Sequence, residues 1–148
     1  MGLGFKFKHH FFNAFRELFV HHHGSLSFRA KVFALVIAAD DNLNVESYAL
    51  VKEAGMTIYD NNEDRANLLM LSTKEFVEKV KLNNGLYIDT LATNLQKELK
   101  IIPRYAHKIN VEELEPLLAL SDNQDTVSYQ KNILEFLQNL KEETLNKR

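Results

Sequence analysis

The chain has 148 residues, of which 45% are hydrophobic and 26% are charged, a profile that excludes a disordered or fibrous chain and fits one globular domain. Because it contains no cysteine, disulfide frameworks, thiolate nucleophiles and cysteine-ligated zinc are excluded. The net charge of −2 is uneven: residues 1–31 hold five Lys/Arg and one acid, whereas residues 32–148 hold thirteen Lys/Arg and nineteen acids. The acidic body argues against a nucleic-acid partner. No apolar run approaches the roughly 20 residues that cross a bilayer, so we expect a soluble, cytoplasmic protein.

The first 23 residues are basic and aromatic, with six of the ten Phe and five of the six His. Drawn as a helix from about Lys8 to His22, this segment is strongly amphipathic, with Arg16 on its polar face. Its apolar face is formed by Phe7, Phe11, Phe12, Phe15, Leu18 and Phe19. The sequence leaves open which of three surfaces this apolar face contacts: the protein's own bundle, a groove on a protein partner or second copy, or the inner surface of a membrane. We therefore divide the chain into an N-terminal helix (residues 1–24) and a helical domain (residues 25–148), joined by a short hinge at Gly24-Ser25.

The rest of the chain predicts helices almost throughout, and no stretch shows the alternation typical of a strand. The expected helices cover residues 28–39, 45–59, 63–71, a stretch from 72 to the turn at 83–85, 88–101, a stretch from about 111 to the polar break at 121–126, and a last stretch after that break. The first of these is apolar on nearly every face, which is typical of a helix at the centre of a bundle. We predict an all-α, compact bundle of about six to seven helices.

Local signals set the expected ends of these helices. Asn44 and Asn110 are good N-caps, because their side chains accept a hydrogen bond from an unpaired backbone N–H. The sequence Ser72-Thr73-Lys74-Glu75 has the form of a capping box and predicts a new helix start. Pro116 predicts a kink or a split in the helix that contains it. The charged C-terminal tail is expected to fray.

Two regions share one plan, in which an apolar helix is followed by an acidic turn and a capped helix. The first runs from Val36 to Glu46, and the second follows 82 residues later, so that Asp40 aligns with Asp122 and Val45 with Val127. This pattern predicts that the bundle has two similar halves.

The first of these turns resembles the tellurite-resistance TerB family, in which an alanine-rich helix ends in Ala-Asp-Gly and an acid follows on the next helix. Ala39-Asp40-Asp41 and Glu46 stand at those positions here, although Asp41 replaces the usual Gly. The similarity in helix order covers about residues 28–140. It implies a compact fold of about seven helices built from two similar halves, and a function in stress response or envelope-linked signalling.

The acidic turns are rich in the oxygen atoms that hard cations such as Ca²⁺ prefer as ligands. If the two turns meet in space, a divalent cation would be held by Asp40, Asp41, Asn44, Glu46, Asp122 and Asp125. The first turn is not an EF-hand, because Val45 stands where that loop requires Gly. A structural interpretation stays open beside the cation site, since Asp and Asn also cap helices and form turns.

No P-loop, dinucleotide fingerprint, nucleophile elbow or His-Glu-x-x-His motif is present. We therefore expect a non-enzymatic TerB-like interaction or sensing module with no cofactor other than a divalent cation at the acidic turns. Two alternatives stay open. One is a peripheral membrane or partner-docking protein anchored by its N-terminal helix, and the other is a carboxylate-dependent metal enzyme.

Overall fold

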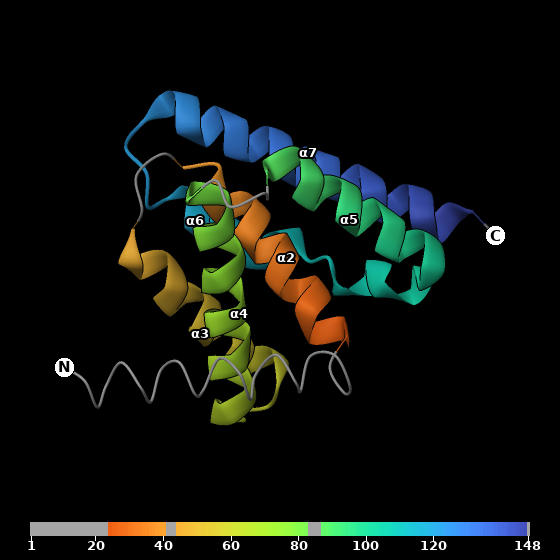
Figure 1. Ribbon diagram of the computed structural model, residues 1–148, viewed down its shortest axis with the longest axis horizontal. Helices are drawn as coiled ribbons and strands as arrows, with labels where there is room; N and C mark the ends of the chain where they lie inside the picture. The colour runs from red at the N-terminus through yellow and green to blue at the C-terminus, as the bar shows by residue number, and fades with distance from the viewer. Residues whose placement is uncertain (1–23, 41–43, 83–86, 148) are drawn as a thin grey trace.

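The computed structural model describes residues 24–40, 44–82 and 87–147. Within these ranges the chain forms six α-helices and one 3₁₀ helix and no strand, which confirms the prediction of an all-α bundle. The elements are α2 (Gly24–Ala38), α3 (Val45–Ile58), α4 (Glu63–Lys81), α5 (Ile88–Ile101), η1 (Pro103–Lys108), α6 (Val111–Leu118) and α7 (Gln124–Asn146) (Figure 1). The predicted N-terminal helix and the predicted turn at 83–85 lie outside the described residues.

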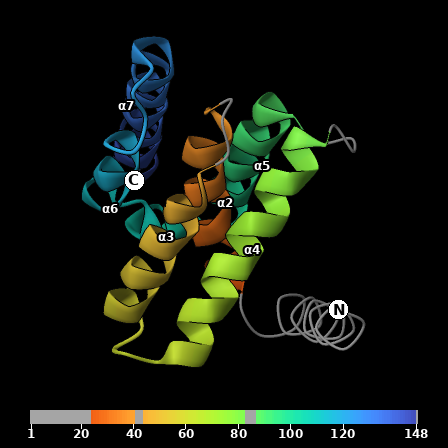
Figure 2. The same ribbon diagram turned by 90° about the vertical axis from the view of Figure 1, so that its left-hand side faces the viewer.

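α2 is the central helix of the bundle, as its sequence predicts. It packs against α4, α5, η1, α6 and α7, and Figure 2 shows α6 and α7 on one side of it with α4 and α5 on the other. Every residue from Val32 to Ala38 is buried. A helix that is apolar all round is stable only with neighbours on all sides, and the other helices supply them.

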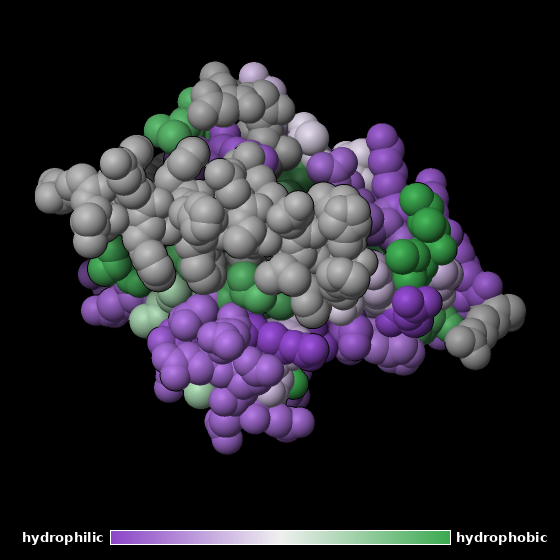
Figure 3. Space-filling model, turned by 60° about the horizontal axis from the view of Figure 1, so that its bottom comes forward, coloured by the Kyte–Doolittle hydropathy of each residue, from purple (hydrophilic) through white to green (hydrophobic). Residues whose placement is uncertain are grey.

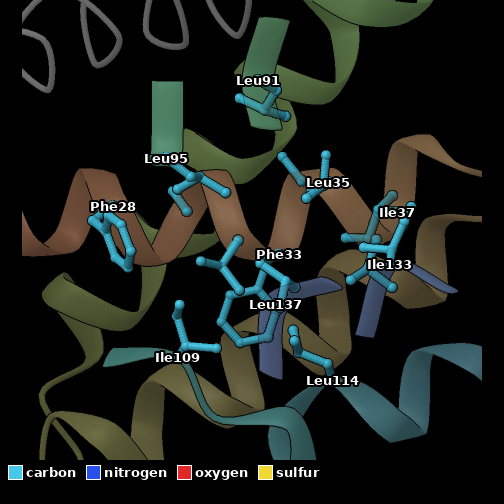
Figure 4. Packing of buried hydrophobic residues seen from close by; sticks show 14 of the residues in the cluster. Phe28, Phe33, Leu35, Ile37, Leu91, Leu95, Ile109, Leu114, Ile133 and Leu137 are labelled. Atoms are coloured by element: carbon cyan, nitrogen blue, oxygen red, sulfur yellow. The ribbon is translucent and has the colours of Figure 1, made fainter. Parts of the chain in front are cut away.

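The side chains of α2 divide between these neighbours (Figure 4). Leu35 points toward the part of α5 that contributes Leu91 and Leu95, and Phe33 lies on the side of α2 that faces Leu137 of α7. These five side chains are all at most 3% exposed. Full burial of such side chains contributes about 1.5–3 kcal/mol each, so this core is the main source of stability.

The two charged residues of α2 each have a partner on another helix or in the turn after α3. The Lys31 ammonium lies 2.9 Å from a carboxylate oxygen of Glu98 on α5 and 5.7 Å from the ring centroid of Phe76. The Arg29 guanidinium lies 6.0 Å from the ring centroid of Tyr59. Both cations therefore keep a partner while the rest of the helix is buried.

α3 and α4 lie side by side in close contact (Figures 1 and 2). Gly55 permits this approach, because a Cβ added there would lie 2.9 Å from the Ala66 Cα. The turn between the two helices places Asp60 and Asn61 at φ values of 51° and 64°, a region that Asp and Asn enter more readily than most residues. Asn62 then caps α4 by accepting from the Arg65 N–H at 3.1 Å.

The prediction of a helix break near Leu71 is wrong, because α4 continues through it to Lys81. Ser72 and Thr73 are buried, at 1% and 0% exposure, and do not cap a helix. The Thr73 hydroxyl donates to the Leu69 carbonyl one turn earlier, at 2.8 Å. This bond satisfies the hydroxyl inside a continuous helix, so the capping signature is not used.

Three other expectations about helix ends are corrected. Gly24 and Ser25, predicted as a hinge, are the first described residues of α2 and are helical. The helix containing Pro116 is not split: α6 runs through it to Leu118, which is consistent with the loss of only one intrahelical bond so near the helix end. The predicted fraying of the C-terminal tail is also wrong, because α7 continues to Asn146 and Leu145 packs against the core.

Candidate functional site

The two acidic turns that the sequence singles out meet in the structure. One cavity of about 440 Å³ is lined by Asp40, Asn44 and Val45 of the first turn and by residues 120–123 of the second, which include Asp122. Asp40, Asn44 and Asp122 therefore line one cavity, and a cation site shared by them stays a prediction. Asp41 lies outside the described residues.

Two of the predicted ligands do not line this cavity. Glu46 and Asp125 are exposed in the first turns of α3 and α7, where negative charge is favoured by the helix dipole. Among the described residues no group of three His, Cys, Asp or Glu side chains is arranged to hold a metal ion. The part of the site that the structure describes thus offers two carboxylates, fewer ligands than Ca²⁺ usually takes.

Several oxygen atoms of these turns already accept hydrogen bonds within the protein. The Asn44 Oδ1 accepts from the Glu46 N–H at 2.9 Å. The Asn123 Oδ1 accepts from the N–H groups of Asp125 and Thr126, at 2.9 and 3.2 Å. These are N-cap bonds, so the structural interpretation is confirmed for Asn44. Asn123 has the same role at the start of α7.

The C-terminal end of α2 is satisfied by side chains from other helices. The Gln130 amide nitrogen of α7 donates to the Val36 carbonyl at 3.1 Å, and the Lys81 ammonium of α4 donates to the Asp40 carbonyl. A positive group near the last carbonyls also favours the helix dipole. The first acidic turn therefore has a cation of the protein's own beside it.

The register of the predicted repeat is corrected at the second turn. The alignment of Val45 with Val127 requires the two capped helices to begin 82 residues apart, but α3 begins at Val45 and α7 at Gln124. Asn123, not Thr126, occupies the N-cap position that Asn44 occupies in the first turn. The second turn is shorter than the aligned sequences imply, and the wider likeness of the two halves stays a prediction.

A larger cavity, of about 780 Å³, lies where α5 ends, η1 begins and α7 passes. It is open to solvent. Its apolar lining residues are Leu99, Ile101, Ile102, Pro103 and Leu140, and its other lining residues are Gln96, Lys100, Arg104, Glu143, Thr144 and Lys147. Ile101 is 78% exposed. The cavity thus combines an apolar lining with three basic side chains and one acid.

The basic side chains of this cavity form no salt bridge in the described structure, although the Arg104 guanidinium lies 5.7 Å from the ring centroid of Tyr105. Within the described residues the salt bridges involve Lys31, Lys52 and Lys79, and Lys100, Arg104 and Lys147 pair with no carboxylate there. All three are exposed. Their charge is consequently available to a binding partner.

A third cavity, of about 420 Å³, lies beside η1 and shares Arg104 with the 780 Å³ cavity. It is lined by Gly24, Ser25, Arg104, Tyr105, His107 and Lys108. Gly24 allows the start of α2 to pass close to η1, because a Cβ added there would lie 2.7 Å from the Tyr105 hydroxyl. This cavity also has a basic lining and no acid.

We call the surface around the two cavities the η1 surface, defined by Lys100, Ile101, Arg104, His107, Lys108 and Lys147. Figure 3 shows apolar side chains among hydrophilic ones at the right-hand end of the molecule, where α5 ends. The sequence reasoning missed this surface. The signal was present as Lys97, Lys100, Arg104 and Lys108 with only Glu98 among them, but Lys147 joins them only through the fold.

The predicted contact residues of the N-terminal helix, Phe7, Phe11, Phe12, Phe15, Arg16, Leu18 and Phe19, lie outside the described residues. Of the helices that are described, none combines the length and the apolar character needed to cross a membrane. The chain matches no protein-family model, no curated protein and no solved structure. Functional inference therefore rests on the residues and their arrangement.

Proposed function

We propose that this chain is a non-enzymatic, TerB-like interaction module whose docking site is the η1 surface. The observation that carries this proposal is the combination at one open cavity of an exposed apolar residue, Ile101, with three basic side chains that have no carboxylate partner in the described structure. Binding sites typically combine apolar lining with a few convergent polar groups.

The chemistry of this surface selects an acidic ligand with apolar parts. Lys100, Arg104 and Lys147 outnumber the single acid of the cavity, Glu143, so negative charge is attracted. Burial of Ile101 by a ligand would remove a large apolar side chain from water. The resemblance of Ala39-Asp40-Asp41 to the TerB family supports the same class, a domain of stress response that acts by interaction.

The dye 8-anilinonaphthalene-1-sulfonate tests the docking site, because it combines one anionic group with apolar rings. We expect saturable binding, measured by fluorescence at a temperature where circular dichroism shows the native fold. The double variant Lys100→Gln with Arg104→Gln should weaken it about five- to thirty-fold, as expected for two partly solvated charge contacts of 0.5–1 kcal/mol each.

The matched control is Lys52→Gln with Lys79→Gln, which removes the same charge from α3 and α4. Those two residues lie in exposed salt bridges elsewhere on the molecule. We expect the control to bind the dye as wild type does. Absence of saturable binding, or an equal loss in both double variants, would overturn the η1 surface as a docking site.

A second candidate function, divalent-cation binding, is favoured by the cavity that Asp40 and Asp122 share. Calorimetric titration with Ca²⁺, Mn²⁺ and Zn²⁺ tests it. Binding by wild type that is lost in Asp40→Ala with Asp122→Ala would support the site. No heat of binding in wild type, or binding unchanged in the double variant, would remove both the cation site and the carboxylate metal enzyme.

A further inference from the structure

We infer that the partner of the η1 surface is an anionic phospholipid membrane. This inference rests on the proposed function, because it names the partner of the same surface. It is carried by the arrangement of charge and exposed apolar area around η1 and by the place where residues 1–23 join the described structure.

The η1 surface has the composition of a peripheral membrane contact. Lys100, Arg104, Lys108 and Lys147 face a single acid, Glu143, across the two cavities. Ile101 follows Lys100 in the chain and is 78% exposed. Basic side chains that reach lipid phosphates around an apolar side chain that enters the interface are the two elements of such contacts.

The openness of the larger cavity favours a membrane over a small soluble ligand. Small-molecule sites bury about 70–90% of their ligand, whereas the cavity between α5 and α7 is open to solvent. A lipid held in a bilayer needs no such enclosure, because only its head group and the upper part of its chains meet the protein. The charges of Lys100, Arg104 and Lys147 also lie on long, exposed side chains, which suit a fluid anionic surface.

The attachment point of the N-terminal segment supports the same partner. Gly24 lines the smaller cavity beside Arg104 and Lys108, so residues 1–23 join the structure at the edge of the η1 surface. By sequence that segment carries three Lys/Arg against one acid and six Phe. The segment and the η1 surface therefore carry charge of the same sign, and an anionic membrane attracts both.

Two weak signals on one chain also explain how a chain whose described helices do not cross a membrane would stay on one. A single weak membrane contact is marginal and reversible, and stable anchoring takes two. Tethering makes the second contact effectively intramolecular, which raises the combined affinity above that of either part. The η1 surface and the Phe-rich segment would be these two contacts.

Co-sedimentation of the full chain with vesicles tests this inference. One set of vesicles contains phosphatidylcholine alone, and the other contains equal parts of phosphatidylcholine and phosphatidylglycerol. We expect binding to the anionic vesicles only, weakening as salt is raised. Lys100→Gln with Arg104→Gln should lower the partition coefficient about 30-fold, the product of two basic contacts at a membrane surface.

Two further variants separate specific docking from net charge. Ile101→Ser should lower partitioning about tenfold without loss of the fold, because it removes apolar area at an exposed side chain. Lys52→Gln with Lys79→Gln should bind the anionic vesicles as wild type does. An equal loss in the two double variants would overturn the inference, because binding would then follow net charge alone.

The remaining outcomes distinguish this inference from the proposed function. If the chain binds the anilinonaphthalene dye through Lys100 and Arg104 but no vesicle, the membrane partner is wrong and the docking site stands. If soluble poly-glutamate binds through the same two residues and vesicles do not, the partner is an acidic protein. If vesicles bind and Phe11→Ser with Phe15→Ser abolishes all binding while Lys100→Gln with Arg104→Gln has no effect, only the N-terminal segment contacts the membrane and the inference fails.

Discussion

The acidic turns and the η1 surface are both charged regions, and they use their charge in opposite ways. At the acidic turns the side-chain oxygens of Asn44 and Asn123 accept backbone hydrogen bonds, and the Asp40 carbonyl accepts from Lys81. At the η1 surface Lys100 and Arg104 pair with no carboxylate in the described structure. Polar groups that are satisfied internally stabilise the fold, and those left unsatisfied at an exposed surface are available for binding.

This difference shows why a cluster of acidic residues is a poor guide to function in a small helical protein. Each helix leaves unpaired backbone N–H groups at its start, and Asn, Asp and Ser supply the acceptors that satisfy them. A turn between two helices therefore collects polar and acidic residues for structural reasons. Lys100 and Lys147, near the exposed Ile101, form no salt bridge in the described structure that would explain them in this way.

The largest expected effect at the acidic turns comes from the buried amide that caps α2. Gln130 is 2% exposed and donates to the Val36 carbonyl. Gln130→Ala should lower the free energy of unfolding by about 3 kcal/mol, because it leaves a cavity and an unpaired buried carbonyl. Gln130→Leu should cost less, about 1–2 kcal/mol. It also leaves the Val36 carbonyl unpaired, but it keeps the side-chain volume and removes the Gln130 Oε1, which is buried without a partner.

Urea denaturation of these variants measures the effect, with Gln138→Ala as the control. Gln138 lies on the same helix, where it donates to Glu142 at 3.0 Å in an exposed position. We expect this control to change stability by less than about 0.5 kcal/mol. A Gln130→Ala variant as stable as wild type would show that the polar groups of the acidic turn region do not stabilise the fold.

A smaller effect is expected at the N-cap of α7. Asn123→Ala removes an oxygen that accepts from two backbone N–H groups and should cost about 1 kcal/mol. Asn132→Ala, at an exposed position inside the same helix, should be neutral or slightly stabilising because Ala is the better helix former. If chemical denaturation gives the two variants equal stability, the capping interpretation of the second acidic turn is wrong.

Much of the fold could be predicted from the sequence because its signals are local. The caps at Asn44 and Asn110 act within one helical turn, and the structure confirms them. The signal at Ser72-Thr73 failed because a hydroxyl can cap a new helix or bond back to its own, and only the packing of α4 decides between them.

The candidate sites depend more on tertiary structure than the helix ends do. The sequence leaves open whether the two acidic turns meet, and the structure places Asp40 and Asp122 at one cavity. The η1 surface needed tertiary information, because Arg104 and Lys147 are far apart in the chain and meet only when α7 passes the end of α5. The approach of Gly24 to Tyr105 likewise has no sequence signal.

The smallest expected effect on stability comes from the carboxyl group of Glu113, which is partly buried in the folded chain. Burial raises the pKa of Glu113 above its ordinary value of 4.5, while the Arg29 guanidinium and a hydrogen bond from Asn110 lower it, and the net shift is upward. The folded chain then holds this proton over a pH range in which the unfolded chain has lost it. The free energy of unfolding therefore falls as pH rises from below 4.5 through the raised pKa.

Glu113→Gln removes this titration, so the melting temperature of the variant relative to wild type should be higher at pH 7 than at pH 4. Glu112→Gln is the control, because it removes a charge from the same first turn of α6 at an exposed position and shares any loss of helix-dipole stabilisation. The rise with pH should be larger for Glu113→Gln than for this control. An equal or opposite trend would mean that burial does not raise the pKa of the Glu113 carboxyl. The contrast between buried and exposed charged groups would then not extend to α6.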